Sequence, residues 1–183
     1  ALAGCDDFPG LTTGPSLALT SAQQGQGRVM LVPPTGYCID KRSLRASFAL
    51  MARCATLGGA ASGAPLALIT ATTATLAATG GVRADDLGNG QEIVLSRSDT
   101  DTLSLIQVRG TPPNASLRDV FWRAAGQIGN QVVALALYEG AQGPALGTLA
   151  PDLLMQTMQR TQDQSAAIQS AQQDKSATTP TKR

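Results

Sequence analysis

The feature that most constrains the fold is a pair of strand-like runs separated by a short turn. Residues 120–127 carry Val, Phe, Trp and Ala, residues 131–138 are rich in Val, Ala and Leu, and Ile128-Gly129-Asn130 joins the two runs. Gly-Asn is typical of a tight turn that needs positive φ, so the two runs predict a β-hairpin. Large aliphatic side chains fall at every second residue of the second run, which predicts one buried face. A chain with this hairpin contains antiparallel sheet.

The rest of the chain adds further strands and one helix. Strands are predicted at residues 28–32, 66–75, 92–95 and 103–108, and Tyr37-Cys38-Ile39 follows a Thr-Gly turn. The stretch 43–57 fits either a helix or a strand, and Gly and Pro on both sides favour a strand from Ser47. Pro151 and Asp152 fit the first turn of an amphipathic helix. The predicted class is α+β: a mostly antiparallel sheet with a C-terminal hairpin and a packed C-terminal helix.

Composition excludes several kinds of function. The 183 residues contain no His, which removes Ser-His-Asp catalysis, Cys-His catalysis and His-ligated zinc. Lys and Arg number 14 against 13 Asp and Glu, and no basic run stands out, so nucleic acid is not an expected partner. Aromatic residues make up only 3%, so the core must rest on small aliphatic side chains.

The N-terminal residues Leu2-Ala3-Gly4-Cys5 resemble the lipobox of bacterial lipoproteins. The resemblance implies that residues 1–4 are a signal-peptide remnant and that Cys5 carries a diacylglycerol thioether and an amide-linked acyl chain such as palmitate. Several acyl chains anchor a protein stably to a membrane surface. In this family Asp after the lipidated Cys favours the inner membrane, so Asp6 and Asp7 point there, with the outer membrane as the alternative. The expected location is periplasmic and lipid-anchored.

The other two cysteines fit the same compartment. Cys38 and Cys54 form an even pair once Cys5 is assigned to lipid, and an exported chain meets an oxidising environment. A Cys38–Cys54 bridge closes a loop of about 17 residues, worth roughly 3 kcal/mol in the chain-entropy model. The alternative is two buried reduced thiols in a cytosolic protein. Two Cys without His are too few for structural zinc, so no metal is expected.

The composition divides the chain into four parts. Residues 1–4 are the signal-peptide remnant, and residues 5–26, with Gly, Ser, Thr and Gln, are the anchor and a flexible tether. Residues 27–160 form a single α+β domain. Residues 161–183 are rich in Gln, Ser, Thr and Ala and predict a polar, largely disordered tail, although Ala and Gln also permit some extension of the helix.

Two candidate contact sites stand out. Lys41, Arg42 and Arg45 form a basic cluster that either contacts anionic headgroups or an acidic partner, or is a solvated turn. Trp122 begins the hairpin beside Phe121, and one of the two aromatic rings is expected to face the core. An exposed ring would suit a partner interface, and core packing is the alternative.

Acidic residues do not form a recognisable catalytic or metal motif. Asp85, Asp86, Asn89 and Glu92 offer oxygen ligands, but their spacing misses the calcium-loop pattern, so a solvated turn is expected. An enzyme would need carboxylates such as Asp40, Asp85 and Asp119 to converge in a cleft. The prediction is therefore a protein that is not an enzyme and has no cofactor.

Two wider resemblances complete the prediction. Residues 33–40, with Cys54, Phe121-Trp122-Arg123 and the final helix, resemble a group of small exported proteins of alphaproteobacteria. The element order is also similar to the PsbP-like α/β/α sandwich, which implies an accessory or assembly role in a membrane complex. A sheet backed by a helix would offer an Ala- and Thr-lined surface or a sheet edge to a protein partner. The alternative function is a periplasmic carrier of a lipid or other small apolar ligand.

Overall fold

The computed structural model describes residues 16–76, 81–142 and 144–177. It contains ten strands, three short 3₁₀ helices labelled η and one α-helix. In chain order they are β1 (Ala18–Leu19), β2 (Ala22–Gln24), η1 (Gly25–Gly27), β3 (Val29–Leu31), β4 (Tyr37–Asp40), β5 (Phe48–Arg53), η2 (Cys54–Leu57), β6 (Ala67–Thr75), η3 (Ala84–Leu87), β7 (Ile93–Asp99), β8 (Ser104–Arg109), β9 (Val120–Ile128), β10 (Gln131–Glu139) and α1 (Leu149–Ala177).

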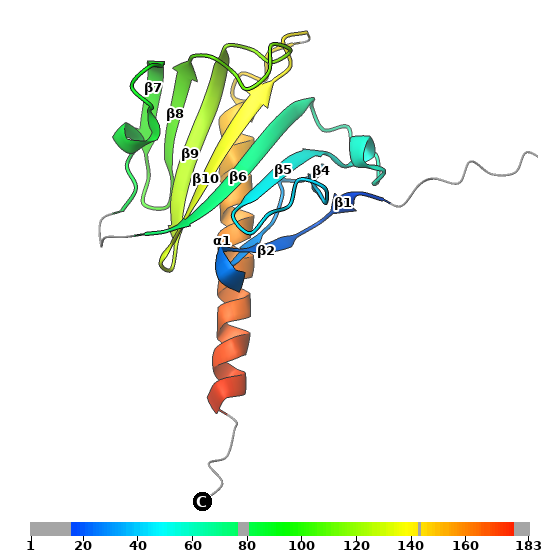
Figure 1. Cartoon of the computed structure of the whole chain (residues 1–183), viewed down its shortest axis with the longest axis vertical. Helices are drawn as coiled ribbons and strands as arrows, with labels where there is room; N and C mark the ends of the chain where they lie inside the picture. Colours follow the sequence, from blue (N-terminus) through cyan, green and yellow to red (C-terminus); the bar gives the residue numbers. More distant parts are fainter. Residues whose placement is uncertain (1–15, 77–80, 143, 178–183) are drawn as a thin grey trace, which may run out of the picture.

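Eight strands form one antiparallel sheet in the order β1-β4-β5-β6-β10-β9-β8-β7 (Figure 1). The predicted hairpin is β9–β10, and it lies near the middle of this sheet. Gly129 has φ +59°, as the predicted tight turn requires. Strands β2 and β3 form a separate two-stranded sheet.

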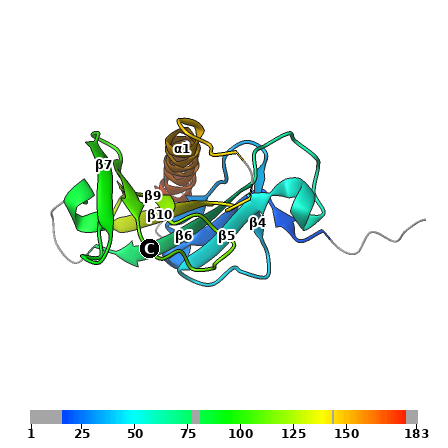
Figure 2. The same ribbon diagram turned by 90° about the horizontal axis from the view of Figure 1, so that it is seen from above.

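Helix α1 lies over one face of the large sheet, above β9 and β10, and it also contacts β3 (Figure 2). The main core fills the space between them, with Val133 and Leu135 from β10 and Leu154 and Met158 from α1. Gly126 of β9 lies directly beneath the helix, because a Cβ there would be 3.0 Å from the Met158 sulfur. A smaller cluster on the opposite face includes Phe121.

Side chains of α1 complete one edge of β3 in place of another strand. The Met30 N–H donates to the Ser165 hydroxyl at 2.8 Å, and the Val32 N–H donates to the Thr161 hydroxyl at 3.1 Å. Thr161 and Ser165 are four helical residues apart, a rise of about 6 Å, and Met30 and Val32 are two strand residues apart, about 6.8 Å. The two hydroxyl groups therefore match the spacing of the two N–H groups. Hydroxyl groups therefore bind the middle of the helix to the domain, where large apolar side chains are absent.

The predicted α+β class is confirmed. The sheet is antiparallel, the hairpin lies next to the C-terminal helix in the chain, and that helix packs on the sheet. Residues from Ser47 onward form a strand and not a helix, since β5 pairs with β4 and β6. The more specific similarity to the PsbP-like sandwich stays a prediction.

The domain boundaries differ from the predicted ones at both ends. Strands β1 and β2 lie within residues 5–26, where a flexible tether was expected, because β1 pairs with β4 and β2 pairs with β3. Helix α1 continues to Ala177 through much of the predicted disordered tail. Ala and Gln have good helix propensity, and Thr161 and Ser165 hydrogen-bond to β3. Among the described residues, no helix is long and apolar enough to cross a membrane.

The Cys38–Cys54 disulfide predicted from the sequence is present. It joins β4 to the start of η2, and the two Cα atoms are 4.8 Å apart. The bond therefore closes the loop that contains the whole of β5. Cys38 is buried and Cys54 is half-buried.

Candidate docking surface

The face of the sheet that α1 does not cover carries small and apolar side chains, and Figure 1 is viewed onto it. Strand register places them in two rows across β5, β6 and β10, with alternate residues of the same strands buried beneath them. We call this surface the open face. Its six residues are Phe48, Thr72 and Ala134 in one row and Leu50, Thr70 and Ala136 in the next.

The open face is uncharged and made largely of short side chains. Thr and Ala side chains extend only slightly above a sheet, so they leave the surface flat and open to a partner's side chains. Phe48 is the bulkiest of the six, and it is 37% exposed. Contiguous apolar patches of this kind mark interaction sites in soluble domains. The Ala- and Thr-lined surface expected of a sheet backed by one helix is thus present.

Two hollows border the open face. One of about 320 Å³ is lined by Leu66, Leu68, Leu117 and Tyr138 with neighbouring backbone. The other, of about 300 Å³, lies beside η3 and includes Thr70, Thr72 and the guanidinium-bearing Arg123. The first hollow is apolar. The second is lined by four of the six open-face residues, and Asp86 and Arg123 give it a charged margin.

A partly buried ion pair forms that charged margin. Arg123 contacts Glu92, whose side chain is 4% exposed, and also donates to the Leu87 carbonyl at 2.9 Å. The guanidinium lies 5.5 Å from the centre of the Phe121 ring, whose own centre is 5.0 Å from that of Tyr138. Burial raises the pKa of Tyr138, with Arg123 lowering it and Glu92 raising it further. These contacts fix Arg123 in place.

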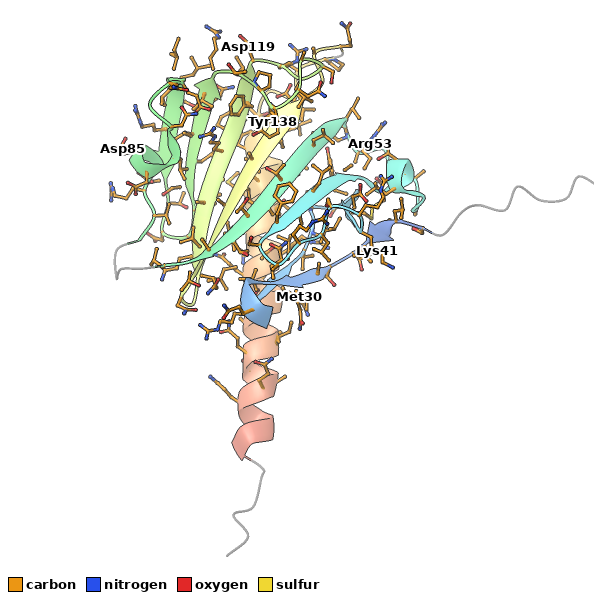
Figure 3. The ribbon with its side chains drawn as sticks, in the orientation of Figure 1. Met30, Lys41, Arg53, Asp85, Asp119 and Tyr138 are labelled. Carbon is orange, nitrogen blue, oxygen red and sulfur yellow. A yellow bond between two sulfur atoms is a disulfide. The ribbon has the colours of Figure 1, made fainter. Side chains whose placement is uncertain are left out.

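The predicted basic cluster lies in the loop between β4 and β5, next to β1 (Figure 3). Arg42 pairs with Asp40 at 2.9 Å, and this hydrogen bond lowers the pKa of the Asp40 carboxyl. Arg45 donates to the backbone carbonyls of Arg42 and Leu44. Lys41 is exposed. The charge of Arg42 is therefore balanced locally, and contact of this cluster with headgroups or a partner stays a prediction.

Trp122 lies on the α1 side of the sheet and not on the open face. It is half-buried and packs against the main core, while its neighbour Phe121 is buried in the smaller cluster on the other side. The two rings face opposite sides of the sheet, as strand spacing predicts. The position of Trp122 fits the core-packing alternative better than a role at the open face.

The acidic residues near η3 have separate partners. Asp85 pairs with Arg97 at 3.0 Å, Asp86 accepts the Arg83 N–H, and Asn89 accepts the Gln91 N–H. Among the described residues, no group of three His, Cys, Asp or Glu side chains is arranged to hold a metal ion. Calcium ligation by this segment has no support from the geometry.

The three carboxylates that an enzyme would need lie on different parts of the molecule. Asp40 ends β4, Asp85 belongs to η3, and Asp119 precedes β9, where it pairs with Arg109 at 3.6 Å. Figure 3 shows Asp85 beside η3 and Asp119 at the far end of the sheet. They do not converge in a cleft.

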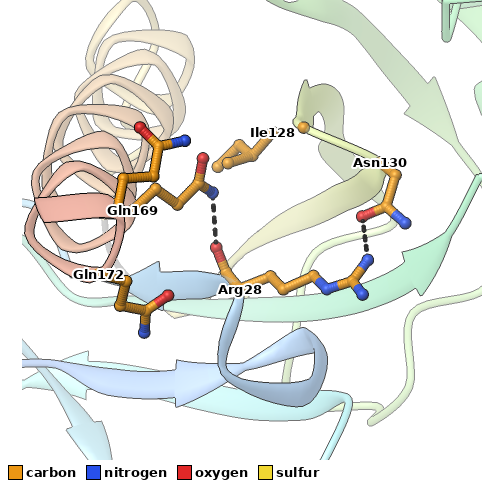
Figure 4. Close-up of a pocket in the computed structure, with 7 residues that line it drawn as sticks. Arg28, Ile128, Asn130, Gln169 and Gln172 are labelled. Carbon is orange, nitrogen blue, oxygen red and sulfur yellow. Dashed lines mark hydrogen bonds between the residues drawn. The ribbon is translucent and has the colours of Figure 1, made fainter. Parts of the chain in front are cut away.

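A further hollow of about 500 Å³ lies between the β9–β10 turn and α1 (Figure 4). Arg28 donates to the Asn130 side-chain oxygen at 2.7 Å, and its own carbonyl accepts from Gln169 at 3.2 Å. These bonds tie the hairpin turn, the start of β3 and the helix together. The lining is rich in amide groups and does not resemble a lipid cavity.

Cys5, Asp6 and Asp7 lie outside the described residues, so their predicted roles stay predictions. No protein-family model matches the chain, and no curated protein matches it either. Sequence reasoning anticipated an Ala- and Thr-lined surface but not its location. The alternating Thr and Ala of β6 were the available signal, and the pairing of β6 with β5 and β10 decides which of them are exposed.

Proposed function

We propose that this chain is a non-enzymatic periplasmic lipoprotein that serves as an accessory or assembly subunit of a membrane-associated complex. Cys5 is the lipid-bearing residue, and the inner membrane, indicated by Asp6 and Asp7, is the destination. The open face carries the proposal, because it is an uncharged, small-residue surface that α1 leaves uncovered.

The export half of the proposal is supported by the disulfide. Stable disulfides occur mainly in proteins of oxidising compartments such as the periplasm. Cys38 and Cys54 are joined, which leaves Cys5 as the one cysteine available for another purpose. Two or more acyl chains on Cys5 would hold the domain at a membrane surface.

The docking half is supported by the chemistry of the open face. A partner surface that covers the six residues must be mainly apolar, because a charge buried against them would lose its hydration, and only the margin beside Asp86 and Arg123 offers a counter-charge. Tethering raises the local concentration of the domain near membrane partners, so even a modest interface would be occupied. A neighbouring subunit of a membrane-associated complex would both present such an apolar surface and lie within reach of the tethered domain.

The carrier alternative has less support. Its natural site is the apolar hollow beside Leu66 and Tyr138, and about 320 Å³ is at the lower end of the range for small-molecule pockets. The hollow of about 500 Å³ is lined by Arg28 and several Gln side chains, which do not suit an acyl chain. The observations therefore favour docking over transport.

Intact-mass analysis of the protein purified from its native membranes tests the anchor. We expect a mass that begins at Cys5 with acyl groups added, a gain of about 2 Da on reduction of the single disulfide, and loss of membrane association in a Cys5→Ser variant. An unmodified chain with three free thiols, or a Cys5→Ser variant that stays with the membrane fraction, would contradict the proposal.

A further inference from the structure

The open face has the width of one α-helix. Its floor consists of short side chains from β6 and β10, which are Thr70, Thr72, Ala134 and Ala136. The larger Phe48 of β5 lies along one side of this floor, and η3 lies along the other, because Asp86 and Leu87 border the same hollow as the floor residues. Neighbouring strands are about 4.8 Å apart, so β5 and β10 are separated by about 10 Å, close to the roughly 10–12 Å diameter of a helix with its side chains.

Backbone chemistry favours a helix over an extended segment as the element that covers this floor. A strand or loop laid on it would bury its own N–H and C=O groups against side chains of which only Thr70 and Thr72 can hydrogen-bond. A helix pairs these groups internally, so only its side chains meet the sheet. Helix α1 covers the other face in this way, and Gly126 lets it come close to β9. The short side chains of the floor permit a similarly close approach.

One charge at the margin of the floor has no counter-charge. Asp86 is exposed and borders the hollow of about 300 Å³ beside η3. One of its carboxylate oxygens accepts the Arg83 N–H, but no described residue forms an ion pair with it. The adjacent Asp85, by contrast, pairs with Arg97 at 3.0 Å, and Arg123 on the same hollow is engaged in an ion pair of its own. A Lys or Arg side chain of a covering segment would therefore find a free carboxylate here.

We propose that the partner covers the open face with an amphipathic α-helix, and that a Lys or Arg side chain at the margin of this helix pairs with Asp86. This inference rests on the proposed docking role and adds the form and the charge of the partner. A second copy of this chain has no such helix to supply. Among the described residues α1 is the only α-helix, and its apolar side chains Leu154 and Met158 are buried against its own sheet. The covering helix therefore belongs to a different protein.

Photo-crosslinking with mass-spectrometric mapping of the attached residues tests the helix. A small diazirine amino acid replaces Phe48, Leu50 or Thr72 in turn, in the full chain and in cells that make the protein. We expect the attached residues of the partner to lie in one segment and to recur at every third or fourth position, as on one face of a helix. Attachment at every second position, or scattered over several segments, would overturn the helix while leaving the docking role in place. No adduct from any of the three positions would contradict the docking role itself, and this inference with it.

Asp86→Asn tests the ion pair, because Asn still accepts the Arg83 N–H but carries no charge. The yield of the adduct from position 72 should fall about two- to fivefold, since one exposed interfacial ion pair is lost. Asp101→Asn is the matched control, because Asp101 is exposed in the turn between β7 and β8, and it should leave the yield unchanged. Both variants should unfold at the wild-type temperature. A wild-type yield from Asp86→Asn, or an equal loss in both variants, would overturn the ion pair.

Discussion

At the scale of single residues, hydroxyl groups perform tasks that other domains give to large apolar side chains. Thr157, Thr161 and Ser165 are all buried on α1, and each carries a polar atom into the interior. Thr161 and Ser165 use theirs to pair the backbone of β3. In a chain with 3% aromatic residues, this pairing is a major part of what positions the helix.

Thr161→Val tests that role. The substitution keeps the shape but leaves the part-buried Val32 N–H without its acceptor, so we expect unfolding to become easier by about 1–3 kcal/mol. Thr157→Val is the control, since the Thr157 hydroxyl bonds only the Leu153 carbonyl of its own helix, and it should cost clearly less. Urea denaturation measures both, and equal losses would refute the role of Thr161.

Tyr37 should make the fold sensitive to alkaline pH. Its hydroxyl donates to the Pro65 carbonyl at 2.6 Å, and burial raises the pKa of Tyr37 to about 12 from 10, with Arg53 lowering it. The folded state thus holds the proton more tightly than the unfolded state. The stabilisation that the protonated Tyr37 gives the folded state is complete below pH 10 and is lost as the pH rises towards 12. It amounts to at most roughly 2–3 kcal/mol.

Urea denaturation between pH 9 and pH 11 checks this expectation, with approximate steps of one pH unit. The free energy of unfolding of the wild type should fall over the alkaline part of this range. The free energy of unfolding of the Tyr37→Phe variant should fall less steeply over the same range, because this variant has no hydroxyl at position 37 to titrate. Parallel curves for the two proteins would show that Tyr37 is not responsible.

At the scale of elements, the strands could be predicted from the chain because their patterns are local. Alternation of apolar residues and the Gly-Asn turn identify β9 and β10 without reference to any other segment. The sequence-based boundaries failed where a segment has no strand pattern of its own and becomes a strand only through its pairing partner. Ala18–Leu19 becomes a strand only because β4 lies beside it, and Ala22–Gln24 only because it pairs with β3.

The candidate site was likewise predictable in its local features and not in its long-range ones. The composition of the open face could be predicted, because the alternating Thr and Ala of β6 are visible in the sequence. Its location could not, because the rows form only when β5 and β10 pair with β6.

The disulfide joins β4 to the start of η2, directly after β5. It spans a sequence separation of 16, so removing it should lower the free energy of unfolding by roughly 3 kcal/mol. Denaturation of the wild type with and without a reductant measures this difference. A Cys38→Ala, Cys54→Ala double variant should match the reduced wild type and show no response to the reductant; a response would mean that another effect is being measured.

At the scale of the whole molecule, the two sides of the sheet are covered to different extents. One side is closed by α1 and the β2–β3 sheet and contains the main core (Figure 2). The other side presents the open face. This asymmetry is what the proposed docking role requires.

Photo-crosslinking in cells that make the protein tests this account most directly. A crosslinking amino acid replaces Thr72 on the open face or, as control, Ala166, which is exposed on α1. The account predicts one discrete membrane-associated adduct from position 72, absent from position 166 and absent when Cys5→Ser releases the protein from the membrane. The same adduct from both positions, or none from position 72, would contradict it.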